Sequence, residues 1–251
     1  SLGFYEYSAP AFCDIWDRKA WAMANPSLGY LISEEAIEET IATSTIEAAR
    51  TETLCQWVSS LTSPFTPGSW EDICDRSMEM TPGPLTVFAF DIDMSRRNAA
   101  LIAGQILPDG RIGVALVQTW ESQISVDELK IAVEIKEWCD KYKPRVVLYD
   151  RYTTLAVAER LQKSGVMVET IVGAEFYAAC STLKDQIDNK RVVHAGQDVL
   201  DQQMNNCGAK STDSSWRLIR KASAGPIVGP IGLAMVVSRL SQPQSTPQIF
   251  A

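Results

Sequence analysis

Two short apolar runs that each end in an aspartate constrain the fold of this chain more than any other feature. The first run is Thr86-Val-Phe-Ala-Phe-Asp91, and the second, Arg145-Val-Val-Leu-Tyr-Asp150, ends 59 positions later. Both are rich in β-branched and aromatic residues, which is typical of strand interiors. An acid at the tip of a core strand is poorly solvated and rigidly held. Two such acids on adjacent strands can share a divalent cation, so the sequence predicts a metal site formed by Asp91 and Asp150.

The chain between the two acids predicts how their strands are placed. Residues 98–107 and 111–120 form two more apolar runs, joined by the hairpin turn Pro108-Asp-Gly110. An amphipathic helix follows over 126–139, and Pro144 ends it before the strand of the second acid. Three meandering strands and then alternating helices and strands give the element order of an RNase H-like fold. In that order the first strand is central and lies beside the strand of the second acid, which is the layout of a metal-dependent nuclease.

The rest of the chain continues an α/β alternation. A helix over 153–163 ends at Gly165, and a strand over 166–172 follows. Helical patterns then cover three stretches: 175–189, 197–206 and 229–240. A strand-like run, 215–221, lies between the last two. We therefore expect a mixed sheet flanked by helices and preceded by a mainly helical segment.

The net charge of −8 is unevenly distributed along the chain. Residues 1–80 contain 13 acidic and 4 basic residues, whereas residues 81–251 contain 18 acidic and 19 basic ones. The acidic excess belongs to the front segment, so the total charge does not exclude DNA binding by the rest. Six scattered cysteines without a CxxC pair and a single histidine argue against a zinc site. No apolar run approaches the roughly 20 residues of a membrane span.

The sequence pattern divides the chain into three segments. Residues 1–80 are predicted to be mainly helical, with a helix that starts after Ser33 as its N-cap. This front segment contains tryptophans that indicate packing surfaces: Trp16, Trp21, Trp57 and Trp70. The Pro- and Gly-containing stretch 81–84 marks the start of the nuclease-like domain, 81–241. Residues 242–251 form a polar, proline-containing tail that we expect to be thinly packed.

Five short motifs occur in a characteristic order. The front segment contains Trp21-Ala-Met-Ala-Asn25-Pro26-Ser-Leu-Gly29 and Ala49-Arg50-Thr-Glu-Thr-Leu-Cys-Gln-Trp57. The later part contains Phe88-Ala-Phe-Asp91, Val146-Val-Leu-Tyr-Asp150, and His194-Ala-Gly196 followed by Leu200-Asp201. In order and spacing they resemble the large terminase subunit of tailed bacteriophages, the motor that packages and cuts viral DNA. The family's phosphate loop, which ends in Gly-Lys-Ser/Thr, does not occur in this sequence, so we expect a chain that starts in the last part of the ATPase domain or in the linker.

The resemblance implies a metal-dependent endodeoxyribonuclease that acts on double-stranded viral DNA. It implies two Mg²⁺ or Mn²⁺ ions, one activating the attacking water and the other stabilising the leaving 3′ oxygen. Asp91 would bridge both ions and Asp150 would bind one, while waters complete the magnesium coordination. The implied partners are the terminase small subunit and the portal, and the implied place of action is the host cell cytoplasm.

One stretch departs from the family pattern. The family supplies a third acid just before its final helix, but residues 223–232 read Ser-Ala-Gly-Pro-Ile-Val-Gly-Pro-Ile-Gly without a carboxylate. A neighbouring acid could substitute, with Asp198, Asp201 and Asp213 as candidates. Alternatively, the second metal is bound weakly, or the protein is impaired in cleavage.

Other polar residues are candidates for the site. Asp93 would be a metal ligand or a turn-forming residue. His194 is expected to fix its loop or to meet a phosphate rather than to act as a general base. Six basic residues are candidates for phosphate contacts: Arg96, Arg97, Lys210, Arg217, Arg220 and Lys221.

Two alternative functions stay open. The first is a resolvase or integrase on the same fold, against which the front segment and its two motifs argue. The second is a nuclease-like module that only grips DNA or docks on the portal, catalytically reduced by the missing third acid.

Overall fold

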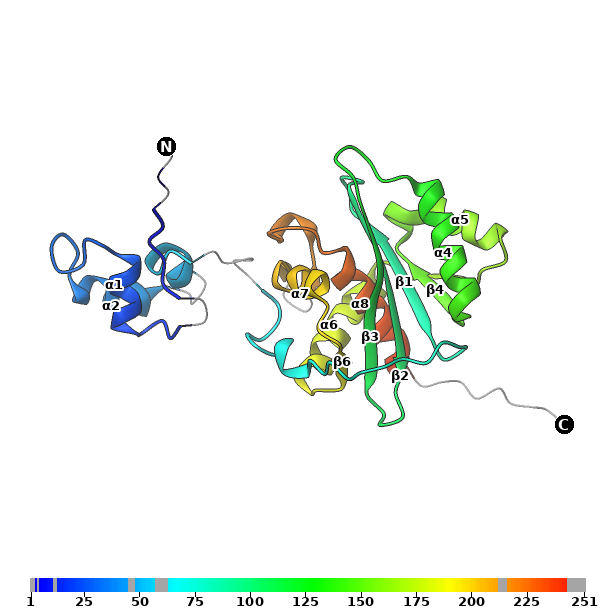
Figure 1. The fold of residues 1–251 in the computed structure, drawn as a ribbon, viewed down its shortest axis with the longest axis horizontal. Helices are drawn as coiled ribbons and strands as arrows, with labels where there is room; N and C mark the ends of the chain where they lie inside the picture. The colour runs from blue at the N-terminus through cyan, green and yellow to red at the C-terminus, as the bar shows by residue number, and fades with distance from the viewer. Residues whose placement is uncertain are drawn as a thin grey trace. The chain divides into compact units, whose positions relative to one another are not determined.

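The structure is a computed structural model that describes residues 3, 5–10, 13–44, 48–56, 63–211 and 216–242. The chain forms two compact units, residues 1–62 and residues 63–251 (Figure 1). Trp57, Asp213 and all but the first residue of the predicted tail lie outside the described residues.

The first unit is a small helical body. It contains α1 (Arg18–Ala24), α2 (Glu34–Thr43) and the π-helical turn η1 (Ala49–Thr53) around a core that includes the buried Trp21 and Leu54. The predicted N-cap is confirmed, because the Ser33 hydroxyl accepts a hydrogen bond from the Ala36 amide at 3.2 Å. The Asn25 side chain donates to the Thr53 carbonyl at 2.9 Å. This bond ties together the two sequence motifs of the front segment.

The second unit is built on a six-stranded mixed sheet in the order β5-β4-β1-β2-β3-β6. The strands have these bounds: β1 Val87–Ile92, β2 Asn98–Ile106, β3 Ile112–Glu121, β4 Val146–Tyr149, β5 Val168–Thr170 and β6 Val192–His194. Strand β1 pairs antiparallel with β2 and parallel with β4. The predicted meander, its turn at Gly110 (φ +86°) and the central position of β1 are therefore confirmed.

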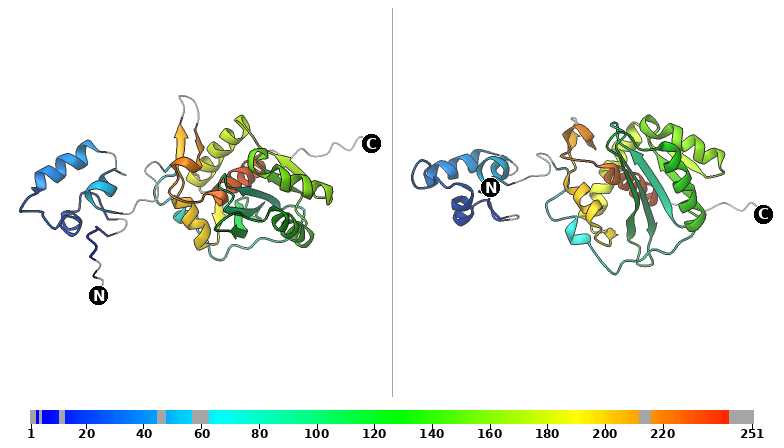
Figure 2. Two further views of the ribbon diagram at one scale, coloured as in Figure 1. Left: turned by 90° about the horizontal axis from the view of Figure 1, so that it is seen from above. Right: turned by 45° about the horizontal axis from the view of Figure 1, so that its top comes forward.

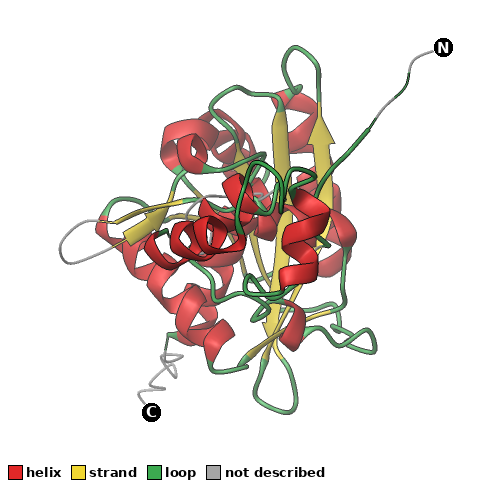
Figure 3. Ribbon diagram, turned by 90° about the vertical axis from the view of Figure 1, so that its left-hand side faces the viewer, coloured by secondary structure: helices red, strands yellow, loops and turns green. Residues whose placement is uncertain are grey.

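Helices cover both faces of this sheet (Figures 1 and 3). One face carries α4 (Glu128–Tyr142) and α5 (Arg151–Lys163), and the other carries α6 (Ala174–Asp188), α7 (Asp198–Asn205) and α8 (Val228–Ser241). Helix α8 is buried almost all round and packs directly on β1 and β2, which explains its continuous apolar sequence. Because both faces are covered, every residue of β1 is buried.

Residues 63–80, which the sequence pattern grouped with the front segment, pack in the second unit. Phe65, Trp70 and Ile73 belong to the core on the α8 side of the sheet, and the short 3-10 helix η2 (Glu71–Ile73) lies in this stretch. The boundary between the compact units falls between Thr62 and Ser63.

A small hairpin outside the main sheet was only half predicted. Strands β7 (Ala209–Ser211) and β8 (Trp216–Leu218) pair antiparallel and project from the unit as the orange strands of Figure 2. The prediction of a strand over 215–221 is wrong at its C-terminal end, because Arg220–Ala222 form the 3-10 turn η3. No helix in the described part of the chain is long and apolar enough to cross a membrane.

Candidate active site

The alternation of side chains along β1 and β4 turns both strand-end acids to the same face. Val87 and Ala89 of β1 lie in the core on the α8 side, and Leu148 of β4 does the same. Asp91 and Asp150 continue these alternating positions, so they share that face. The last residue pair in the parallel register is Phe90 with Tyr149, which puts the two acids one position further on, side by side. The register of β1 and β4 therefore places Asp91 and Asp150 next to each other, as the sequence predicts.

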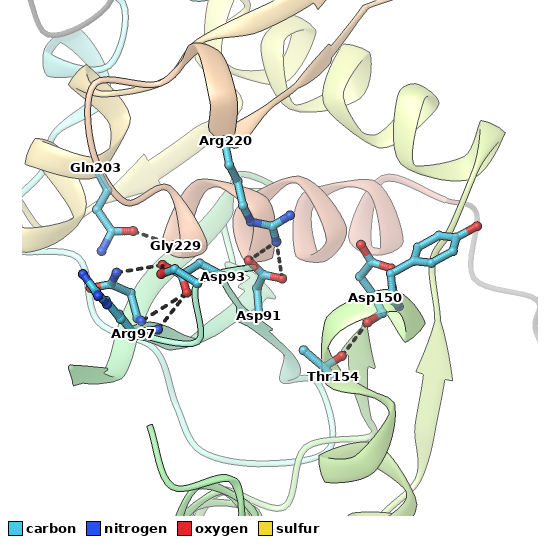
Figure 4. A network of polar contacts seen from close by, with 11 residues as sticks. Asp91, Asp93, Arg97, Asp150, Thr154, Gln203, Arg220 and Gly229 are labelled. Atoms are coloured by element: carbon cyan, nitrogen blue, oxygen red, sulfur yellow. Dashed lines mark hydrogen bonds and ion pairs between the residues drawn. The ribbon is translucent and has the colours of Figure 1, made fainter. Parts of the chain in front are cut away.

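Asp91 is a buried carboxylate that forms an ion pair with Arg220. Its side chain is 0% exposed, and Nη2 of Arg220 donates to both of its oxygens, at 2.7 Å to Oδ1 and 2.6 Å to Oδ2 (Figure 4). Burial raises the pKa of Asp91 from 3.8 to about 6; the charge and hydrogen bonds of Arg220 oppose this shift, whereas the nearby charges of Asp150 and Asp93 add to it. The site therefore concentrates negative charge in a poorly solvated place, which is the environment that attracts a cation.

Asp150 joins β4 to α5. It is the N-cap of this helix, and its carboxylate accepts a hydrogen bond from the Tyr152 amide at 3.0 Å. The Thr154 hydroxyl donates to the Asp150 backbone carbonyl at 2.6 Å (Figure 4). These two bonds fix the backbone and the side chain at the point where strand becomes helix. The half-buried Asp150 carboxylate keeps free lone pairs that could bind a metal ion.

Asp93 is occupied by the turn that follows β1. Its carboxylate accepts hydrogen bonds from the Arg97 amide at 2.9 Å, the Ser95 hydroxyl at 2.9 Å and the Asn98 side chain at 2.8 Å. Burial alone would raise the pKa of Asp93, but these hydrogen bonds from Asn98, Ser95 and Arg97 outweigh it and lower the pKa. Of its two predicted roles, the observed contacts are those of a turn-forming residue.

The stretch before α8, which contains no carboxylate, is held by an amide contact. The Gln203 side chain accepts a hydrogen bond from the Gly229 amide at 2.8 Å at the start of α8 (Figure 4). A Cβ at Gly229 would lie 3.0 Å from this Gln203 oxygen, so the glycine permits the close approach. Among the described residues, no group of three or more His, Cys, Asp or Glu side chains is gathered closely enough to hold a metal ion.

The proposed substitutes for the third acid are placed as follows. Asp201 accepts a hydrogen bond from the Trp70 indole at 2.7 Å and is engaged there. Asp198 is exposed in the first turn of α7, and Asp213 lies outside the described residues.

His194 is a structural residue. Its ring is 2% exposed and stacks on Trp70 with centroids 3.9 Å apart and planes inclined by 9°. The Gly196 amide donates to Nδ1 at 3.2 Å, which makes Nδ1 the acceptor, and Nε2 lies 2.9 Å from the Trp70 carbonyl, to which it can donate. The contacts agree with the predicted role of fixing the loop, and the burial leaves no access to a phosphate.

The six basic candidates fall into three places. Arg96, with φ +56°, forms an ion pair with Glu128, and the adjacent Arg97 lines a polar hollow of about 300 Å³ with Asn98 and Glu121. Lys210 and Arg217 are cross-strand partners on β7 and β8, so they lie on one face of the hairpin. Arg220 and Lys221 are in η3; Lys221 is exposed, whereas Arg220 reaches inward to Asp91.

The sequence did not indicate three features of the site. The sequence makes Arg220 a candidate for a phosphate contact; the structure places it on Asp91, 129 residues away, a contact that no local pattern indicates. Gln203 and Trp70 were also missed as residues that hold the site's surroundings. The only signal for Arg220 is indirect: an ionised acid at the end of a buried strand is stabilised by a positively charged side chain.

Comparison with known proteins supports the fold. No protein-family profile and no curated protein matches the sequence. Among solved structures, the chain is similar to the HK97 bacteriophage large terminase (TM-score 0.62, 22% identity), covering 93% of this chain and 56% of that one. The large terminase nuclease from thermophilic phage G20c matches 71% of this chain and 98% of its own length (TM-score 0.53, 13% identity). The large terminase of the thermophilic bacteriophage D6E in complex with ADP gives a TM-score of 0.53 at 8% identity, over 82% of this chain and 52% of that one.

These similarities confirm two predictions at the level of the fold. The second unit has the RNase H-like fold of terminase nuclease domains, and the resemblance to large terminase chains holds in three dimensions. The chain spans about half the length of the HK97 terminase. Further structures of the G20c nuclease contain bound magnesium and bound cobalt.

Proposed function

We propose that the second unit is the metal-dependent endonuclease of a viral DNA-packaging terminase and hydrolyses phosphodiester bonds of double-stranded DNA. The observation that carries this proposal is the pair of acids, Asp91 and Asp150, side by side at the ends of two parallel strands of a terminase-nuclease fold. Adjacent strands are about 4.8 Å apart, so one cation can lie between two such carboxylates. The bound magnesium and cobalt of the G20c nuclease structures support the same kind of chemistry.

The donor set fits a hard divalent ion. Asp91 and Asp150 offer only oxygen ligands, which Mg²⁺ and Mn²⁺ prefer, and Mg²⁺ keeps several waters, so two carboxylates are enough for one ion. The site already holds a cation on Asp91, the Arg220 guanidinium, which is evidence that positive charge is stabilised there. A bound ion would activate the attacking water and stabilise charge on the scissile phosphate.

The chain's own residues would hold and orient the reacting groups. Asp91 would be held by its strand, which is buried on both faces, and Asp150 by its place as the N-cap of α5. Asp93 would shape the turn that carries Arg96 and Arg97. Lys210 and Arg217, on one face of the hairpin, would contact the DNA backbone together with Lys221.

A second ion has fewer ligands available. Asp91 could bridge two ions, as the resemblance implies, but the described residues supply no third carboxylate to it. In a two-metal site the second ion would therefore depend on Asp91, waters and the phosphate oxygens of the DNA. We expect this second ion to bind appreciably only when DNA is present.

A catalytically reduced module is the second candidate function. The missing third acid and the Arg220–Asp91 ion pair both favour it, because each lowers the capacity of the site to hold metal. Such a module would still grip DNA or dock on the portal. In either case the terminase small subunit, the portal and the ATPase part of the subunit are the partners that we propose for the whole protein.

Plasmid cleavage separates the two candidates. The 251-residue chain is incubated with supercoiled plasmid in Mn²⁺, in Mg²⁺ and in EDTA. The nuclease proposal expects nicked and linear products with metal and none in EDTA, with dependence on Asp150. Duplex binding without any cleavage in either metal would leave the DNA-gripping module as the function.

A further inference from the structure

Arg220 occupies the atoms of Asp91 that a metal ion would use. Its Nη2 donates to both Oδ1 and Oδ2, so neither carboxylate oxygen is free of the guanidinium. Figure 4 shows Arg220 reaching to Asp91 from the segment before α8, with Asp150 on the neighbouring strand. Because Asp91 is completely buried, the ionised form of its carboxylate is stabilised by a positive partner. Arg220 and a divalent ion are therefore competitors for one position.

The contact is suited to exchange. A strong arginine–carboxylate pair uses two nitrogens in a parallel fork, whereas here a single nitrogen serves both oxygens. The Arg220 Nε is buried without a hydrogen-bond partner among the described residues, so the guanidinium is incompletely satisfied on Asp91. The side chain is 25% exposed, which gives it a route to solvent.

The backbone around η3 is held by hydrogen bonds that do not involve the Arg220 side chain. The Ser223 amide donates to the Arg220 carbonyl at 3.2 Å, and the Ser223 hydroxyl accepts from the Gly208 amide at 2.9 Å. The Ala224 amide donates to the Asn206 carbonyl at 3.0 Å. A change of the Arg220 rotamer would leave these backbone hydrogen bonds intact.

A phosphate is the ligand that suits the released guanidinium. Arginine binds phosphate oxygens through paired N–H groups, and this guanidinium has unused donors. The next residue, Lys221, is exposed, and the hairpin that leads into η3 carries Lys210 and Arg217 on one face. A DNA backbone bound by these side chains would bring phosphates close to Arg220.

We propose that Arg220 is a counter-ion switch that pairs with Asp91 in the free protein and moves to a DNA phosphate when a divalent ion takes Asp91. Metal binding and DNA binding then reinforce each other through this side chain. The inference rests on the proposed nuclease function, because it takes Asp91 as the metal ligand. Arg220 acts in it as a positioning residue, which keeps the metal site closed in the absence of substrate.

The first test measures metal affinity without DNA. Calorimetric titration with Mn²⁺ compares the wild type with Arg220→Gln and with Lys221→Gln, which removes the neighbouring positive charge. Removing the competitor should tighten Mn²⁺ binding about tenfold in Arg220→Gln, within the usual range of coupling between sites. An unchanged or weaker affinity, or an equal gain in Lys221→Gln, would overturn the switch.

The second test measures the coupling itself. Fluorescence anisotropy of a labelled random-sequence duplex is recorded in Ca²⁺ and in EDTA, and the gain in affinity on adding Ca²⁺ is compared. We expect this gain to fall at least about fivefold in Arg220→Gln and to persist in Lys130→Gln, a control on α4, which covers the other face of the sheet. If the gain is equal in the wild type and in Arg220→Gln, the switch is overturned and the proposed function is not. If the wild type binds no duplex in either buffer, both the switch and the proposed function are overturned.

A measurement on the wild type alone covers the case in which Arg220→Gln does not fold. Wild-type crystals are soaked in Mn²⁺ and the ion is located by its anomalous signal. The switch requires that Arg220 has left Asp91 when Mn²⁺ is bound there. An ion on Asp91 with both hydrogen bonds from Arg220 intact would overturn it.

Discussion

The Asp150 carboxylate accepts a hydrogen bond from the backbone amide of Tyr152 at 3.0 Å, so one of the two strand-end acids is also the N-cap of α5. The start of the helix thereby fixes the direction of the carboxylate. Asparagine caps helices about as well as aspartate does, so an Asp-to-Asn substitution changes the charge and keeps the cap. This separates the chemistry of the residue from its structural role.

Asp150→Asn is therefore expected to abolish cleavage and to leave stability within about 0.5 kcal/mol of the wild type. Cleavage of supercoiled plasmid in Mn²⁺ and urea unfolding are the two measurements. Asp140→Asn on α4, an exposed acid paired with Lys136, is the matched control and should cut normally. Cutting by Asp150→Asn at the wild-type rate would show that the metal lies elsewhere.

The raised pKa of Asp91 predicts that ionisation of this carboxyl lowers the unfolding free energy of the metal-free protein as the pH rises. Its pKa is about 6 in the folded state and 3.8 ordinarily, so its contribution to stability is fully present below pH 3.8 and is lost as the pH rises through 6. In EDTA, Asp91→Asn should gain stability relative to the wild type, by up to about 3 kcal/mol, between pH 4 and pH 8. Urea unfolding of both proteins across this range is the check. A stability difference that does not change with pH would contradict the prediction.

The hairpin face predicts how DNA binding depends on salt. Replacing Lys210 and Arg217 together by Gln should lower the steepness of log affinity against log salt by about 1.8, since each phosphate contact contributes about 0.9. Anisotropy of a random-sequence duplex in Ca²⁺ measures this. The control removes Lys130 and Lys141 on α4, which covers the opposite face of the sheet from α8. An equal loss of slope in the control would place the DNA on another face.

The contact between α8 and β2 predicts a packing defect. A Cβ at Gly104 would lie 2.3 Å from a methyl carbon of Val236, so Gly104→Ala should destabilise the protein by roughly 1–3 kcal/mol. Adding Val236→Ala should relieve the clash. The double variant should therefore lose less unfolding free energy than the two single variants lose in sum. Thermal unfolding of all four proteins tests this, and strict additivity would contradict the packing.

The absence of a phosphate loop from the sequence predicts that this chain alone does not hydrolyse ATP. A coupled phosphate-release assay should give a rate equal to that of buffer, with and without duplex DNA. Turnover that co-purifies with the chain and survives further purification would contradict the prediction.

The sheet was predictable because its signals are local. Apolar runs bounded by turns gave β1 to β4, and the change of period gave α4. Short elements were harder: β6 and β7 have three residues each, too few for a period to show. The predicted strand 166–172 shortens to Val168–Thr170 for a related reason, because a strand at the end of the sheet is defined by its single neighbour β4.

The acid pair was predictable, and its surroundings were not. Parallel register follows from element order, which brings Asp91 and Asp150 together. Arg220 lies on Asp91 because the β7–β8 hairpin leads into η3, and that path depends on tertiary packing rather than on any pattern near residue 220. Asp93 illustrates the same limit, since only the fold of the turn decides which of its two roles it adopts.

The contacts that hold Trp70 in place have a mechanical consequence. Its indole is bonded to Asp201 and stacked on His194, and its carbonyl contacts the same histidine, so the chain is anchored 17 residues before β1 begins. Tension that arrives along the chain from the first unit would be taken up by this anchor on α7 and β6. Little of this tension would then reach β1, the strand that carries Asp91. Asp91 and Asp150 would keep their spacing while the chain before Trp70 is under tension.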